Sequence, residues 1–128
     1  MMWEIREQVE SMNWEAWSLF YSKEYAKAIT AFQASYDLSP TAQALRGIGE
    51  AHSALGQDRE AILYLAASCG LRPNPRVSFD LAEVLFRAGH LFEAREAAER
   101  ALKALPHYKR AAALLETINQ QWPKFSDE

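Results

Sequence analysis

Three histidines and one cysteine are the residues of this chain best suited to metal or nucleophilic chemistry. His52, His90 and His107 are far apart and show neither the HxxxH nor the HExxH spacing of a helical zinc motif. We expect His52 to pack between helices and His90 to lie exposed in a turn. Cys69 is the single cysteine, so an intrachain disulfide and a multi-thiolate metal site are both excluded. We expect it to be a small buried residue near a helix interface.

A short glycine pair offers a second possible chemistry. Gly47 and Gly49 have the spacing that begins a dinucleotide-binding fingerprint, but no β-strand pattern precedes them. Elsewhere no nucleophile, base and orienting group come together on one expected helix face. The residues therefore predict a protein that is not an enzyme and that needs no cofactor.

Composition narrows the kind of partner. The 128 residues are 49% hydrophobic and 24% charged, which is typical of one globular domain. The net charge is −3 and no cluster of Lys and Arg appears, so we expect no nucleic-acid partner. The sequence also shows no apolar run long enough for a membrane span and no signal-peptide pattern at its start. We expect a cytoplasmic protein without membrane insertion.

Four kinds of position recur along the chain at a step of 33 residues. They are prolines (Pro40, Pro73, Pro106), alanines (Ala28, Ala61, Ala94), turn residues (Lys23, Gly56, Gly89) and small residues (Ala16, Gly49, Ala82). Small side chains allow two helices to approach closely, and proline ends a helix because it lacks the backbone N–H. The pattern predicts repeated helix pairs.

The apolar periodicity and the cap signals place the helices. We expect them at residues 3–22, 25–38, 41–55, 58–71, 75–88, 91–105 and 107–121. Thr41, Asp58 and Asn74 are the expected N-caps. The last helix carries an apolar stripe and a polar opposite face, which is typical of the cap of a helical stack.

The positions that recur every 33 residues resemble the tetratricopeptide repeat, whose 34-residue unit pairs a helix A with a helix B. The family's small residue at position 27 is matched by Ser35, Ser68 and Ala101. The resemblance implies an all-α fold, a right-handed α-solenoid of three repeats with a C-terminal capping helix. It covers one domain, 1–128, with repeats at about 9–40, 42–73 and 75–106, the cap at about 107–121 and a tail at 122–128.

In this family the A helices line a concave groove that binds extended peptides. The positions of this chain that match the groove include five aromatic residues, and the polar ones suit peptide backbone groups. The candidate peptide-binding residues are Asn13, Trp17, Phe20, Tyr21, Arg46, Glu50, Arg76, Phe79, Glu83, Phe86 and Arg87. Several exposed aromatic side chains indicate a partner, because burying each one is worth about 1.5–3 kcal/mol. The alternative is that the N-terminal residues of the chain or a second copy cover them.

Within the repeat family the chain is most similar to the type III secretion chaperones that hold translocator subunits. Residues 47–50 (GIGE) and 82–94 (AEVLFRAGHLFEA) match stretches typical of that class. Trp17 and Phe20 match the class's aromatic pockets for a client segment with Pro and Leu, whereas Asn13 replaces a common aromatic residue.

The resemblance implies a small cytosolic chaperone whose partner is a protein bound through an extended, partly apolar segment. The alternative is a constitutive adaptor subunit of a larger assembly that uses its outer helix B surface, where Glu96 and Glu99 lie. The N-terminal helix offers a homodimer contact through Trp3 and Trp14, and core packing explains these two residues equally well.

Overall fold

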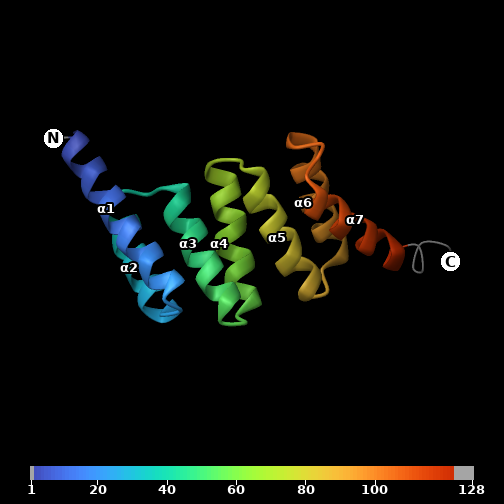
Figure 1. Cartoon of the computed structure of the whole chain (residues 1–128), viewed down its shortest axis with the longest axis horizontal. Helices are drawn as coiled ribbons and strands as arrows, with labels where there is room; N and C mark the ends of the chain where they lie inside the picture. Colours follow the sequence, from blue (N-terminus) through green and yellow to red (C-terminus); the bar gives the residue numbers. More distant parts are fainter. Residues whose placement is uncertain (1, 123–128) are drawn as a thin grey trace. The chain divides into compact units, whose positions relative to one another are not determined.

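The computed structural model describes residues 2–122, which contain seven α-helices and no β-strand (Figure 1). They are α1 (Met2–Tyr21), α2 (Tyr25–Leu38), α3 (Ala42–Ala54), α4 (Asp58–Leu71), α5 (Pro75–Arg87), α6 (Leu91–Ala104) and α7 (Lys109–Gln121). The predicted all-α fold is confirmed, and most helix ends agree with the prediction within one residue. Contacts between residues divide the chain into two compact units, Met1–Arg72 and Pro73–Glu128.

The turns that join α1 to α2, α3 to α4 and α5 to α6 share one hydrogen-bonded form. The middle residue of each has a positive φ, at 63° for Lys23, 75° for Gly56 and 87° for Gly89. The following N–H donates to the carbonyl five residues earlier at 2.9 Å, from Glu24 to Leu19, Gln57 to His52 and His90 to Leu85. This Schellman motif ends each first helix in the left-handed conformation that glycine adopts without strain. The predicted equivalence of Lys23 with the two glycines is confirmed.

Side-chain caps begin two helices as predicted. The Thr41 hydroxyl accepts from the Ala44 N–H at 3.1 Å, and the Asn74 side chain accepts from the Arg76 N–H at 2.9 Å. Pro75 occupies the first turn of α5, where the missing N–H costs no hydrogen bond.

One predicted N-cap and one predicted helix start are wrong. Asp58 is the first residue of α4 and not its N-cap, because Gln57 completes the preceding Schellman turn and the helix follows at once. The last helix begins at Lys109 and not at His107, because the Tyr108 N–H bonds to the Leu105 carbonyl at 3.0 Å in a turn.

In the first unit the small residues of the repeat lie where helices meet. The small residues of α1 to α4 that match the repeat pattern are all buried: Ala16, Ala28, Ser35, Gly49, Ala61 and Ser68. The Ser68 hydroxyl donates to the Ala42 carbonyl at 2.8 Å, which ties α4 to the start of α3. In Figure 1 these two helices run side by side, and α2 contacts both α1 and α3.

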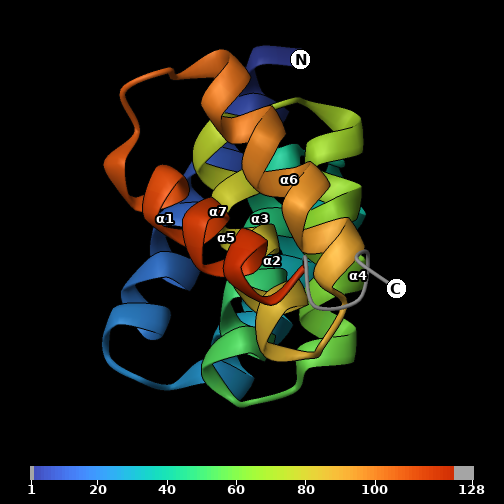
Figure 2. The ribbon, with the colours of Figure 1, turned by 90° about the vertical axis from the view of Figure 1, so that its right-hand side faces the viewer.

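In the second unit α7 packs on α6 and also contacts α5 (Figure 2). Ala111 and Ile118 are fully buried on its apolar stripe. The Trp122 ring lies 5.8 Å from the ring of Phe92, and the Arg95 guanidinium lies 5.7 Å from the Trp122 ring. The predicted capping role of this helix within its unit is confirmed. Trp122, the first residue of the predicted tail 122–128, packs on α6, and residues 123–128 lie outside the described residues.

His52 and His90 contact side chains of the chain itself. His52 stacks on Tyr64 at 5.6 Å, and its Nδ1 donates to Oε1 of Gln57 at 2.6 Å, so it packs between helices as predicted. His90 is exposed, 3.7 Å from the Glu93 carboxylate. Cys69 is half-buried and not fully buried as expected. In the described part of the chain no group of three or more acidic, His or Cys residues is placed to hold a metal ion. No helix there is both long and apolar enough for a membrane span.

Candidate functional site

A cluster of aromatic rings lies at the end of α1. The Trp17 ring lies 5.3 Å from Phe20 in an edge contact and 5.9 Å from Tyr21 in a stacked one. Phe20 lies 5.4 Å from Tyr21 and 5.3 Å from Tyr25. Trp17 and Phe20 are half-buried, and Tyr21 is 76% exposed. We call Trp17, Phe20 and Tyr21 the aromatic patch, because the structure brings these three predicted site residues together.

A rigid base positions the aromatic patch. The Trp17 ring rests edge-on against Phe32 at 5.0 Å, and Phe32 is fully buried on α2. The Phe32 ring in turn occupies the space beside Gly47 of α3, where an added Cβ would meet three ring atoms at 2.3–2.5 Å. Gly47 is therefore a packing residue, and this close approach explains the glycine that resembled the start of a nucleotide fingerprint.

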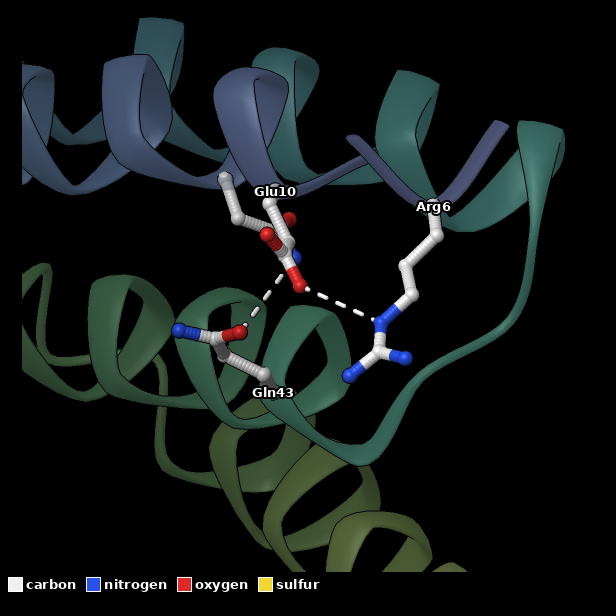
Figure 3. A network of polar contacts seen from close by, with 4 residues as sticks. Arg6, Glu10 and Gln43 are labelled. Carbon is white, nitrogen blue, oxygen red and sulfur yellow. Dashed lines mark hydrogen bonds and ion pairs between the residues drawn. The ribbon is translucent and has the colours of Figure 1, made fainter. Parts of the chain in front are cut away.

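Beside the aromatic patch, a polar contact links α1 to α3. Asn13 Nδ2 donates to Gln43 Oε1 at 3.5 Å, and Arg6 pairs with Glu10 at 3.4 Å one turn earlier. Figure 3 shows Arg6 and Glu10 along α1, with Gln43 facing them from α3. The expected exposure of Asn13 is wrong: it is 2% exposed, because α3 covers this side of α1. Arg46 and Glu50, also on α3, are half-buried.

The burial of the Asn13 side chain should lower the stability of the folded protein, and substitutions can measure this effect. Its Oδ1 is buried and has no hydrogen-bond partner within the described chain. An unsatisfied buried acceptor costs about 1–3 kcal/mol, so we expect Asn13→Leu to leave the stability unchanged or to raise it by about 1 kcal/mol. Asn13→Asp has the same shape and should destabilise the protein, because it buries a charge. Urea denaturation measures both, and a clear loss of stability in Asn13→Leu would show that Oδ1 has a partner.

The second unit places its site residues differently. Phe79 was expected at an exposed surface, and this is wrong: it is 2% exposed. Helix α7 covers it, with Tyr108 at 5.2 Å and the Arg110 guanidinium 4.8 Å above the ring. Glu83 lies one turn further along α5, 3.8 Å from Arg110. Phe86 is half-buried, and Arg76 and Arg87 are exposed.

Burial is the main cause that raises the pKa of Glu83, with Asp80 acting in the same direction and Arg110 and Arg87 opposing it. The neutral form of Glu83 is therefore favoured in the folded state. Its contribution to stability is complete below the ordinary value of 4.5 and is lost as the pH rises through the higher folded value. Ionisation of Glu83 thus opposes folding.

Glu83→Gln removes this ionisation. We expect the stability of the variant, relative to the parent protein, to improve as the pH rises from about 4 and to level off once the pH passes the raised pKa of Glu83. Urea denaturation across this range measures the difference in the free energy of unfolding. A difference that is constant or that shrinks with pH would contradict the burial effect on Glu83.

The sequence reasoning missed part of the second unit. Tyr108 and Arg110 contact the predicted residues Phe79 and Glu83, but were assigned only to the capping helix. The 33-residue step of the sequence contained the information needed to predict that α7 contacts α5. Pro106 precedes α7 just as Pro40 precedes α3, so α7 contacts α5 as α3 contacts α1.

Solved structures show what this fold resembles. The type III secretion chaperone SycD of Yersinia enterocolitica, in complex with a peptide of the translocator YopD, is 25% identical with a TM-score of 0.84, covering 90% of this chain and 95% of that chain. PcrH in complex with the chaperone binding region of PopD is 22% identical with a TM-score of 0.82, covering 91% and 94%. The first tetratricopeptide domain of Spaghetti (RPAP3), bound to an HSP90 peptide, is 18% identical with a TM-score of 0.87, covering 91% and 94%.

Sequence comparisons give no match: no protein-family model and no curated protein matches the chain. The structural neighbours are nevertheless tetratricopeptide proteins, including type III secretion translocator chaperones. The fold of this chain is thus a tetratricopeptide-like, all-α repeat fold, as its sequence pattern predicts.

Proposed function

We propose that this protein is a non-enzymatic tetratricopeptide module that binds an extended, partly apolar segment of another protein. The aromatic patch is the observation that carries the proposal. Tyr21 is largely exposed and Trp17 and Phe20 are half-buried, so three adjoining rings offer apolar surface on a rigid base. Aromatic side chains in such positions are frequent binding hot spots.

We propose further that the module is a small cytoplasmic chaperone for such a segment and acts as one domain. Two observations support this. SycD, which was solved with a translocator peptide, is 25% identical over 90% of the chain. The residues that resemble the secretion-chaperone class, Trp17 and Phe20, both belong to the aromatic patch.

A peptide titration tests the binding function. The probe is an acetylated, amidated peptide of Ser, Pro and Leu residues, and tryptophan fluorescence reports its binding. We expect a micromolar Kd, which corresponds to about −8 kcal/mol. A peptide of the same length made of Gly and Ser should not bind. Equal affinity for both peptides would contradict recognition of an apolar segment.

The adaptor alternative rests on the charged outer surface of α6. Glu96 and Glu99 are exposed there, and Glu99 pairs with Arg95 at 3.2 Å. The double variant Glu96→Lys with Glu99→Lys separates the two functions when complexes are isolated from the native source. A chaperone keeps one co-purifying client after this change, whereas an adaptor loses its assembly.

The outer side of α1 supports a homodimer contact. Trp3 is 62% exposed and Trp14 is 78% exposed, and their spacing places them on one helical stripe. We propose that a second copy covers this stripe. Light scattering on the parent protein and on Trp14→Glu tests it, and a monomeric parent protein would contradict the dimer.

A further inference from the structure

The second unit contains an open cleft where the loop between α6 and α7 passes the start of α5. The cleft has a volume of about 480 Å³. Its lining residues are Arg76, Leu105, Pro106, His107, Tyr108 and Arg110. Volumes of this size are typical of ligand sites, which combine apolar walls with a few polar groups. Leu105 and Pro106 form the apolar wall here, and both are exposed.

Two guanidinium groups give the cleft its chemistry. Arg110 lies over the Phe79 ring at 4.8 Å and 3.8 Å from Glu83, so these two contacts orient its guanidinium before any ligand arrives. Arg76 is exposed on the first turn of α5, and its charge, like that of Arg110, acts to lower the pKa of Tyr108. Guanidinium groups bind carboxylate and phosphate through paired hydrogen bonds.

Neighbouring groups add donors and limit the charge of the ligand. Burial is the first cause that raises the pKa of Tyr108, so its hydroxyl stays protonated at neutral pH and can donate to an anion. The backbone N–H groups at the start of α7 have no side-chain cap. Two carboxylates lie near these arginines, Glu83 at 3.8 Å from Arg110 and Asp80 one turn after Arg76 on α5, and both act to raise the pKa of Tyr108. They repel a dianion more strongly than a monoanion, which favours a carboxylate over a phosphate.

We propose that this cleft binds an acidic side chain of the client segment, with an adjoining apolar side chain against Leu105 and Pro106. Arg76 and Arg110 bind the carboxylate, and Tyr108 donates to it. This inference rests on the proposed function and adds to it an acidic residue next to the apolar residues of the client.

Two matched peptides test the cleft separately from the aromatic patch. The probe is acetyl-Ser-Leu-Pro-Glu-Leu-Ser-amide, and its twin has Gln in place of Glu. NMR spectra of the labelled protein follow the backbone amides of Leu105 and of residues 107–110 for the cleft, and those of the aromatic patch. We expect the Glu peptide to shift the signals of the cleft and the Gln peptide to bind there about tenfold more weakly, a loss of about 1.4 kcal/mol.

Arg76→Gln should weaken binding of the Glu peptide by about tenfold and leave binding of the Gln peptide unchanged. Arg76 is exposed, so this variant keeps the packing of Phe79 intact. Arg100→Gln, another exposed arginine of the same unit, is the matched control and should change neither affinity.

Three other outcomes would contradict this proposal. Equal binding of both peptides, with shifts only at the aromatic patch, would overturn the cleft and leave the proposed function standing. Tighter binding of a phosphoserine twin would overturn the assignment to a carboxylate. The absence of shifts with every peptide would overturn both the cleft and the proposed function.

Discussion

Replacing Gly47 with alanine is expected to destabilise the protein by about 1–3 kcal/mol, the range typical of overpacking in a core. The new Cβ would lie 2.3–2.5 Å from three ring atoms of Phe32, closer than van der Waals contact permits. Phe32 is fully buried and also supports Trp17, so the ring has little room to move away. The intrinsic preference of a helix for alanine over glycine, about 1 kcal/mol, is too small to offset the clash fully.

Gly70→Ala is the matched control for this prediction. Gly70 lies inside α4, and an added Cβ there meets nothing within 4 Å. It should therefore stabilise the protein by about 0.5–1 kcal/mol, through helix propensity alone. Urea denaturation of both variants gives the comparison. If Gly47→Ala were as stable as Gly70→Ala, the close packing of Phe32 on Gly47 would be wrong.

The second large effect is on peptide affinity. We expect Trp17→Ala to weaken binding of the Pro- and Leu-containing peptide by about 2 kcal/mol or more, as for a hot-spot tryptophan. Trp17 contacts Phe20, Tyr21 and Phe32, so its loss removes both contact area and the support of the other rings. Isothermal titration calorimetry measures the change directly.

Trp17→Ala also removes packing, and a second variant separates binding from folding. Tyr21 is 76% exposed, so Tyr21→Ala should keep the stability and still weaken binding by about 1 kcal/mol. Leu63→Ala is the control, because Leu63 is 65% exposed on α4, away from the predicted site. Unchanged affinity in both Trp17→Ala and Tyr21→Ala would exclude the aromatic patch as the binding surface.

Local features of the fold could be predicted because local chemistry determines them. Left-handed turn residues, N-caps and small contact positions depend on nearby backbone geometry, and each recurs at the 33-residue step. The N-cap error at Asp58 and the helix-start error at His107 both arose where a turn comes directly before the helix: Gln57 makes the Schellman bond and Tyr108 makes the turn bond.

The candidate site was less predictable, because exposure depends on contacts distant in sequence. Trp17, Phe20 and Tyr21 are close in sequence on one helix, so their clustering follows from helical spacing. The burial of Asn13 required α3, and that of Phe79 required Tyr108, which precedes α7, and Arg110 in its first turn. Position within the repeat identified the helix face but not what covers it.

One titration tests the central claim most directly. The indole N–H signal of Trp17 is followed by NMR while the Pro- and Leu-containing peptide is added, with the indole signals of Trp3 and Trp14 as internal references. Binding at the aromatic patch predicts that the Trp17 signal shifts and saturates at micromolar concentrations while the other two stay in place. A Trp17 signal that does not move while the peptide binds would contradict the account.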